Sequence, residues 1–260
     1  MNKCTNHTFV ILAYKESPFL EDCIKSLLSQ TVESNILITT STPTKHIDKL
    51  ALKYDIKIYI NNENSGVVSD WNFAYKTAKT DLVTLVHQDD IYEKNYLKEI
   101  NLSESDSCIV FTDYKEIKNG KIIQSNPLLI IKRVLLLPFF IKKSISNRNI
   151  KRLVLSFGSP ICCPSVTYNK KKLNEFKFNS EYSINMDWDA WLRLAETNHS
   201  FTYVSKQLIQ HRIHSESETT VGMKDNRREQ EDIKIFSRIW GKWLGNLISK
   251  IYSLSYKSNN

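Results

Sequence analysis

The sequence predicts an α/β domain with a mostly parallel central sheet, and two features carry this prediction. In the first half, short runs rich in β-branched residues alternate with helical patterns of about ten residues. This alternation is typical of right-handed βαβ units, in which helices cover a parallel sheet. The second feature is size, since 260 residues with a hydrophobic fraction of 41% suffice for one such domain with a full core.

The first half contains five predicted strands and three predicted helices. The strands cover residues 7–14, 35–40, 56–60, 82–87 and 107–114. The first helix begins at Pro18, and the other two cover residues 44–54 and 67–78. Ligands of parallel sheets bind beyond the carboxyl ends of the strands, so we expect a site in the segments that follow these strands.

After Tyr114 the alternation ends. Asn119-Gly120 predicts a hairpin with a type I′ turn. Residues 128–143 (LLIIKRVLLLPFFIKK) form a hydrophobic and basic stretch that suits contact with a membrane or cover over a ligand site. From Lys224 onward the pattern predicts one long amphipathic helix. Its apolar side holds Phe236, Trp240, Trp243, Leu244, Leu247 and Ile251, and its polar side holds Lys234, Arg238, Lys242, Asn246 and Lys250. Such a helix suits a lipid interface, but packing against the domain or a second subunit explains it equally well.

Composition narrows the class of protein without choosing a ligand. A formal charge of +8 is compatible with a nucleic acid, an anionic membrane or a phosphorylated ligand. The five cysteines include no CxxC pair, so we expect reduced thiols and a cytoplasmic location rather than a zinc site or a disulfide framework. We expect neither a signal peptide nor a spanning helix, which needs about 20 apolar residues.

The fourth predicted strand ends in His87-Gln88-Asp89-Asp90. Residues two apart in a strand point to the same side, so His87 and Asp89 can face one ligand. Carboxylates at the tip of a parallel strand suit a divalent cation held on a diphosphate. The alternative is that Asp89 and Asp90 cap the next helix or begin a turn.

Two later segments also carry candidate residues. Asp187 lies in the first turn of a predicted helix that Asn185 would cap, beside tryptophans, and either acts as a general base or complements the helix dipole. Asp189 has a structural role available, because Arg193 is four residues further on. The segment Gln210-His211-Arg212-Ile213-His214 offers metal and phosphate ligands, although such a cluster is often only a solvated loop.

Taken together and in this order, these segments resemble the family-two inverting glycosyltransferases of the GT-A fold. The resemblance spans residues 9–220. Its parts are Val10-Ile11-Leu12-Ala13-Tyr14 with the helix at residues 19–31, Asn64-Ser65-Gly66 with Trp71-Asn72, the HQDD strand end, residues 186–194 (MDWDAWLRL) and His211-Arg212-Ile213-His214. The first helix and the MDWDAWLRL segment are the most specific parts.

The resemblance implies a role for each matched residue. Asp89 would be the principal metal ligand, with His87 and His214 as further ligands of Mn²⁺ or Mg²⁺. Asp187 would be the catalytic base that deprotonates the acceptor hydroxyl. The donor-binding residues would be Ala13, Tyr14, Thr40, Asn64, Gly66, Trp71, Asp90 and Arg212.

The resemblance also implies the activity and the organisation of the chain. The activity would be inverting, metal-dependent transfer of a sugar from a nucleotide-diphosphate sugar to a saccharide or lipid-linked saccharide. The setting would be bacterial surface polysaccharide synthesis, at the inner face of the cell membrane. Residues 1–222 would form the catalytic domain, with a nucleotide-sugar-binding half (1–115) and an acceptor and catalytic half (116–222). Residues 223–260 would form a C-terminal helical extension.

Two departures from the family pattern matter. His87 stands where the family usually has an aspartate, and Thr39-Thr40-Ser41-Thr42-Pro43 stands where acidic residues often contact the nucleotide base. The identity of the nucleotide therefore stays open. The main competing hypothesis is a nucleotide-sugar-binding protein or nucleotidyltransferase, which would need Asp89 and Asp90 but not Asp187. A nucleic-acid-binding module is suggested by charge alone, and the sequence has no nucleic-acid motif.

Overall fold

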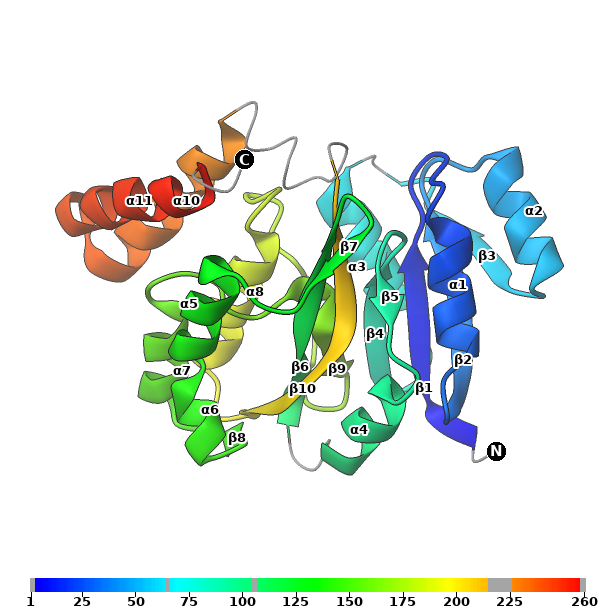
Figure 1. Ribbon diagram of the computed structural model, residues 1–260, viewed down its shortest axis with the longest axis horizontal. Coiled ribbons are helices and arrows are strands. Elements are labelled where there is room, and N and C mark those ends of the chain that lie inside the picture. The colour runs from blue at the N-terminus through cyan, green and yellow to red at the C-terminus, as the bar shows by residue number, and fades with distance from the viewer. Residues whose placement is uncertain (1–2, 64–65, 104–106, 215–225, 258–260) are drawn as a thin grey trace.

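The computed structural model describes residues 3–63, 66–103, 107–214 and 226–257 of the chain. The described residues form a ten-stranded sheet with the order β3-β2-β1-β4-β9-β6-β10-β5, to which β7 and β8 add at β6 and β10. Helices flank this sheet, with α1 and α2 near β1 to β3 and α5 to α8 near the opposite edge (Figure 1). The predicted fold class is confirmed.

All elements that the sequence predicts in the first half are present. They are β1 (Lys3–Leu12), α1 (Leu20–Leu28), β2 (Glu33–Thr40), α2 (Lys45–Lys53), β3 (Lys57–Ile60), α3 (Val67–Thr77), β4 (Leu82–His87) and β6 (Ser107–Lys118). The short β5 (Ile91–Tyr92) and α4 (Tyr96–Ser103) lie between β4 and β6. β1 pairs in parallel with both β2 and β4. Thr44 caps α2, because its side chain accepts a hydrogen bond from the Ile47 N–H.

The second half adds antiparallel strands and a group of short helices. Its elements are β7 (Lys121–Ile123), α5 (Pro127–Leu135), α6 (Leu137–Ile141), β8 (Ser144–Ile145), α7 (Arg148–Leu155), η1 (Cys163–Ser165), β9 (Val166–Asn169), α8 (Met186–Ala195) and β10 (Ser200–Ile213). The predicted type I′ hairpin joins β6 to β7, with φ of 51° at Asn119 and 74° at Gly120. β10 runs parallel to β6, so it ends at the same edge as β1 and β4.

The prediction of one long C-terminal helix is wrong. The chain forms two helices, α10 (Arg227–Trp240) and α11 (Lys242–Lys257), which are separated by Gly241. Gly241 has a φ of 79°, a left-handed conformation that residues with a Cβ atom rarely adopt. The helices then pack closely: a Cβ atom on Gly245 would lie 2.5 Å from the backbone nitrogen of Ser237.

The turn at Gly241 divides the predicted apolar stripe. Phe236 of α10 is fully buried, and the Trp240 Nε1–H donates to the Ser156 carbonyl at 2.8 Å. On α11 the remaining stripe residues, Trp243, Leu244, Leu247 and Ile251, are exposed. Packing against the domain therefore explains α10 but not the outer face of α11. No helix in the described part of the chain has the length and apolar character needed to cross a bilayer.

Candidate active site

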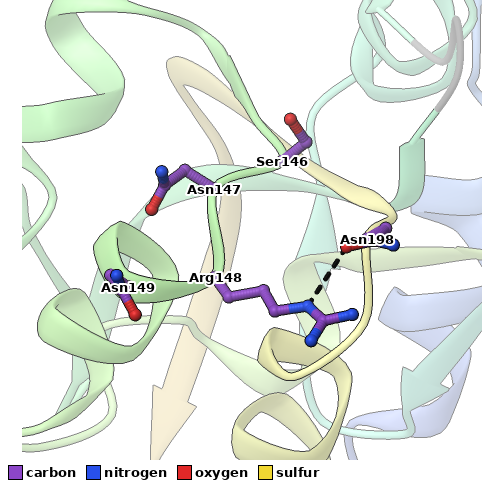
Figure 2. Close-up of a pocket in the computed structure, with 5 residues that line it drawn as sticks. All are labelled: Ser146, Asn147, Arg148, Asn149 and Asn198. Carbon is purple, nitrogen blue, oxygen red and sulfur yellow. Dashed lines mark hydrogen bonds between the residues drawn. The ribbon is translucent and has the colours of Figure 1, made fainter.

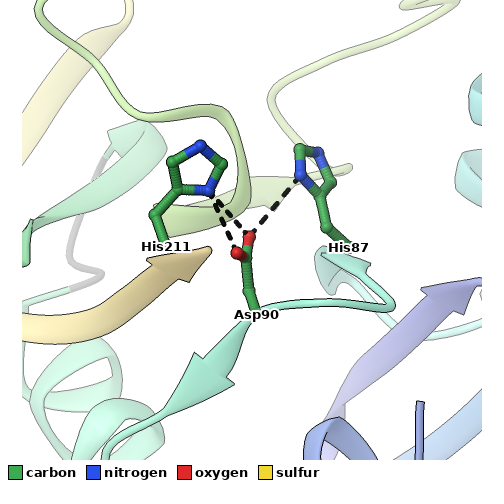
Figure 3. A group of neighbouring side chains, drawn as sticks. All are labelled: His87, Asp90 and His211. Carbon is green, nitrogen blue, oxygen red and sulfur yellow. Dashed lines mark hydrogen bonds and ion pairs between the residues drawn. The ribbon is translucent and has the colours of Figure 1, made fainter. Parts of the chain in front are cut away.

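Three side chains from two strand ends meet at the carboxyl edge of the sheet. His87 is the last residue of β4, Asp90 follows the turn after it, and His211 lies near the end of β10. The His211 Nδ1–H donates to both carboxylate oxygens of Asp90, at 3.0 and 3.2 Å, and His87 Nδ1 lies 3.5 Å from Asp90 Oδ2 (Figure 3). Their possible ligand atoms all lie within 4.8 Å of one another.

A second carboxylate–histidine pair lies beside this group. The His214 Nε2–H donates to Asp89 Oδ2 at 2.7 Å. Burial opposes ionisation of Asp89, but the hydrogen bond from His214 and the charges of His87 and His211 outweigh it, so its pKa lies below the ordinary value. Burial likewise lowers the pKa of His211, but Asp90 overcomes this and raises it to about 9.

The residues present fit a divalent cation. The Nε2 atom of His87 is buried and has no hydrogen-bond partner within the described part of the chain. Asp90 is fully buried, and a carboxylate there needs positive charge or hydrogen-bond donors around it. Imidazole nitrogens with carboxylate oxygens suit transition metals such as Mn²⁺. The predicted ligands fall into two adjacent groups, because His87 lies with Asp90 and His211, while Asp89 lies with His214.

Arg212 connects the two groups. Its backbone N–H donates to Asp90 Oδ1 at 2.8 Å, and its Nε–H donates to the Asp89 carbonyl at 2.9 Å. The guanidinium group lies over the ring of Phe19, 4.2 Å from the centroid. Arg212 therefore holds a positive charge at this edge of the sheet, beside the start of α1.

The predicted donor-binding residues at the end of β1 are linked to the HQDD turn. Tyr14 is half-exposed, and its backbone N–H and carbonyl both bond to the side chain of Gln88, each at 3.0 Å. Ala13 is buried and donates its N–H to the Thr39 carbonyl. These contacts hold the ends of β1, β2 and β4 together.

A carboxylate near the end of β2 was not predicted. Asp70, in the first turn of α3, accepts hydrogen bonds from the Ser41 hydroxyl at 2.7 Å and from Asn61 Nδ2 at 2.8 Å. Thr40 is buried, and its hydroxyl accepts from the Thr42 N–H. Residues 39–43 carry hydroxyl groups and no carboxylate of their own, and Asp70 places an acidic group beside them.

The remaining predicted donor residues lie at the start of α3. Gly66 precedes this helix with a φ of 137°, a conformation open mainly to glycine. Trp71 is buried, and its ring makes an edge contact with His87 at 5.1 Å between centroids. Trp71 thus supports the histidine rather than presenting a face to solvent. Asn64 lies outside the described residues.

Asp187 lies in the first turn of α8 and is partly buried. Its Oδ1 accepts a hydrogen bond from the Trp188 N–H at 2.7 Å. Burial raises the pKa of this carboxyl group, although the Trp188 N–H and the charges of Arg228, Lys132 and His87 act in the opposite direction. A raised pKa suits a general base, because it increases the affinity of the carboxylate for a proton.

Charges link Asp187 to the carboxylate–histidine groups. The charge of His87 lowers the pKa of Asp187, against the larger effect of burial. Burial raises the pKa of the Cys163 thiol in η1, and the charges of Asp187, Cys162 and Asp90 raise it further.

The structure separates the other aspartate of α8 from this region. Asp189 is fully buried and forms ion pairs with Arg193 at 2.8 Å, as predicted, and with Arg238 of α10 at 2.6 Å. Two arginines therefore account for its charge. Asn185 stands at the predicted N-cap position of α8, but its side chain bonds to Asp232 instead of capping the helix.

A surface pocket of about 500 Å³ lies elsewhere in the fold, at the start of α7 (Figure 2). It is lined by Ser146, Asn147, Arg148, Asn149 and Asn198, and the Arg148 Nε–H donates to Asn198 Oδ1 at 3.1 Å. β8, which immediately precedes the pocket, pairs with the beginning of β10, whereas His211 lies near the end of that strand. This pocket is therefore at the opposite edge of the sheet from the candidate site.

Residues 8–176 match the family model described as glycosyl transferase family 2. The chain belongs to this family. Family 2 consists of glycosyltransferases, which assigns the chain to that class of enzyme. A protein from Haemophilus influenzae named "Uncharacterized glycosyltransferase" is 21% identical over 257 residues, which cover 90% of this chain and 73% of that protein.

Solved structures of glycosyltransferases share the fold. S. aureus TarS 1-349 has a TM-score of 0.61 and 16% identity, and the match covers 89% of this chain and 64% of that chain. The same protein in complex with UDP-GlcNAc gives a TM-score of 0.62 at 16% identity, covering 92% of this chain and 72% of that chain. The mannosyltransferase PcManGT from Pyrobaculum calidifontis, in complex with GDP-Man and Mn²⁺, gives 0.60 at 13% identity, covering 90% and 63%.

Proposed function

We propose that this family 2 protein is an inverting, metal-dependent transferase that moves a sugar from a nucleotide-diphosphate sugar to an acceptor hydroxyl. The observation that carries the proposal is the grouping of His87, Asp90 and His211, with Asp89 and His214 beside it, within electrostatic reach of Asp187. Among the structural neighbours, TarS is seen with UDP-GlcNAc, and PcManGT is seen with GDP-Man and Mn²⁺. These complexes support a nucleotide-sugar donor and a cation for this protein.

Each group of residues has a proposed task. The group of His87, Asp90 and His211, or the adjacent pair of Asp89 and His214, would hold the cation. When bound, the cation would neutralise charge on the departing diphosphate. Arg212 contacts a phosphate oxygen. Asp187 takes the proton from the acceptor hydroxyl on the opposite face of the sugar, which inverts the anomeric carbon. The donor lies along Ala13, Tyr14, Thr40 and Gly66, with Trp71 supporting His87, and we add Asp70 as a contact for the nucleotide base.

The proposal also covers the acceptor, the biological role and the location of the protein. We propose a saccharide or lipid-linked saccharide acceptor, a role in surface polysaccharide synthesis, and peripheral contact with the inner face of the membrane. Residues 1–115 supply most of the donor-binding residues, and residues 116–222 form the acceptor and catalytic half. Screening nucleotide sugars for turnover with a panel of saccharide acceptors tests the transfer directly, and release of the nucleotide without any transfer to an acceptor would contradict it.

We expect Mn²⁺ to support turnover at least as well as Mg²⁺ at equal free concentrations. The reason is the nitrogen content of the site, because imidazole binds transition metals better than it binds Mg²⁺. The measurement is initial rate against free metal concentration, with the binding of each ion followed by calorimetry. Higher activity and tighter binding with Mg²⁺ would contradict ligation by the histidines.

We expect kcat to fall at acidic pH with a midpoint above the ordinary carboxyl value of 3.8. Asp187 must be ionised to accept a proton, and burial raises its pKa, so protonation removes the base at a higher pH than for an exposed aspartate. The profile is measured under single-turnover conditions with donor and Mn²⁺ saturating at every pH. A rate that stays constant down to the pH at which circular dichroism detects unfolding would argue against Asp187 as the base.

A further inference from the structure

The exposed apolar residues of this protein are concentrated on one group of helices. Thirteen of the 19 large hydrophobic side chains that are exposed in the described part of the chain belong to α5, α6, α7, the residue pair after α7, and α11. They are Ile130, Ile131, Val134, Leu137, Phe140, Ile141, Ile150, Leu153, Phe157, Trp243, Leu244, Leu247 and Ile251. We call this set the apolar face.

Contacts connect the two parts of the apolar face. The ring of Phe157, just after α7, lies 5.1 Å from that of Trp240, at the turn into α11. Tyr252 of α11 lies against Gly158. Figure 1 accordingly shows α5, α6, α7 and α11 on the same side of the sheet, away from β3. Exposed apolar residues that gather in one part of a protein surface mark a site that binds a partner or a membrane.

The charge of the same segments identifies the partner. Residues 127–157 hold seven basic residues and no acidic residue, and residues 233–260 hold five and none. The rest of the chain holds 24 basic and 28 acidic residues, so the net positive charge of the protein comes from the segments that carry the apolar face. Lys142, Lys143, Lys242 and Lys250 are exposed among these residues.

We propose that the apolar face binds the surface of an anionic phospholipid bilayer. Basic residues around exposed Trp, Phe and Leu side chains fit an acidic headgroup layer, with the apolar residues entering the acyl boundary. A symmetric dimer through this face would bring like charges together without an acidic partner. The proposal names the surface for the peripheral contact proposed above, and it depends on neither the metal nor Asp187.

The test is cosedimentation of the full chain with vesicles of 30% phosphatidylglycerol in phosphatidylcholine, compared with pure phosphatidylcholine. We expect binding to the anionic vesicles that weakens with salt, and a fall of at least tenfold in Ile141→Glu/Ile251→Glu. Leu52→Glu is the matched control, because Leu52 is 86% exposed on α2, and its binding should not change. The proposal would be overturned if the wild type did not bind the vesicles, or if the control lost binding as much as the double variant. It would also be overturned if light scattering showed that the wild type and the control are dimers and the double variant is a monomer.

Glu231 of α10 is buried. It lies far from α8 in the sequence, but its side chain contacts the turn that leads into α8. Its carboxylate accepts hydrogen bonds from the backbone N–H groups of Ser183, Ile184 and Asn185, at 2.7, 2.9 and 2.8 Å, and from the Ser183 hydroxyl at 3.0 Å. The next residue, Asp232, accepts from Asn185 Nδ2 at 2.8 Å.

These bonds hold the turn that leads into α8, which begins at Met186. The last of them is to the N–H of the N-cap residue Asn185, where a carboxylate also complements the helix dipole. Asn185 supplies no side-chain cap to α8, so the carboxylate of Glu231 fixes the entry to the helix from α10. Asp187 follows two residues after the last N–H that Glu231 holds.

We infer that Glu231 is a positioning residue for Asp187, which makes α10 part of the catalytic apparatus rather than an appendage. The inference rests on the proposed role of Asp187. It also means that deletion of the C-terminal helices would disturb the active site, so the apolar face has to be tested by point substitutions.

Glu231→Gln removes charge from the turn, and we expect kcat to fall about 10- to 100-fold with donor affinity and binding stoichiometry unchanged. Glu181→Gln is the control, since Glu181 is exposed and forms an ion pair at 3.8 Å with Lys234, which lies in α10 like Glu231. A fall in stoichiometry that matches the fall in rate would indicate misfolding and overturn the inference, as would unchanged kcat. If Asp187→Asn itself keeps full turnover, the proposed function fails first.

Discussion

Replacing Asp187 with asparagine is expected to lower kcat by about 10²- to 10⁴-fold, the typical contribution of a general base, while donor affinity stays nearly the same. Asparagine has almost the same shape and can still accept the hydrogen bond from the Trp188 N–H. It cannot take a proton from the acceptor. Initial rates and calorimetric titration with the donor give the two quantities, and full turnover in the variant would remove Asp187 from the mechanism.

The same substitution is expected to stabilise the fold. Burial raises the pKa of Asp187 in the folded state, so above that pKa the folded protein bears the cost of a buried charge that the unfolded chain does not bear. Removing the charge should therefore raise the melting temperature, by about 2–4 °C for each kcal/mol gained in a domain of this size. Asp81→Asn is the control, because Asp81 forms a surface ion pair with Lys171 at 2.7 Å. Loss of this ion pair should change neither kcat nor the melting temperature strongly.

The second large effect is expected for Asp90→Asn, which should weaken Mn²⁺ binding and lower kcat by at least about 100-fold. Asp90 is the only carboxylate in the group with His87 and His211, and it also fixes the backbone of Arg212. An amide keeps one acceptor oxygen but loses the negative charge that the cation needs. Calorimetry with Mn²⁺ alone provides a readout that does not depend on turnover.

Asp81→Asn serves again as the matched substitution, and the folded state of each variant is checked by circular dichroism. A folded Asp90→Asn protein that binds Mn²⁺ as tightly as the wild type would show that the cation is held elsewhere. In that case the pair of Asp89 and His214 would be the site to substitute next.

Strand and helix periodicity was sufficient to predict the sheet, because buried parallel strands and amphipathic helices impose it on the sequence directly. It failed at the C-terminus for a specific reason. The apolar positions on both sides of Gly241 continue the same helical spacing, so the reversal there leaves no break in the pattern. Only the φ of Gly241 and the contact of Gly245 with Ser237 define two helices.

The site was predictable where its residues belong to one short segment, and not where packing brings distant residues together. His87, Asp89 and Asp187 come from recognisable segments. The position of His211 beside Asp90 depends on the course of β10, whose pairing with β6 contains irregularities. Asp70 reaches Ser41 from a different element, and Glu231 reaches Ser183 from 48 residues away. No local pattern records such contacts.

The most direct test of the account is the anomalous scattering of Mn²⁺ in crystals grown with a nucleotide-diphosphate sugar. We predict one strong peak within ligand distance of Asp90 and His211 or of Asp89 and His214, with the Asp187 carboxylate across the sugar from the diphosphate. A peak at neither pair of side chains, or an Asp187 carboxylate turned away from the bound sugar, would contradict the assignment of cation and base to a common pocket.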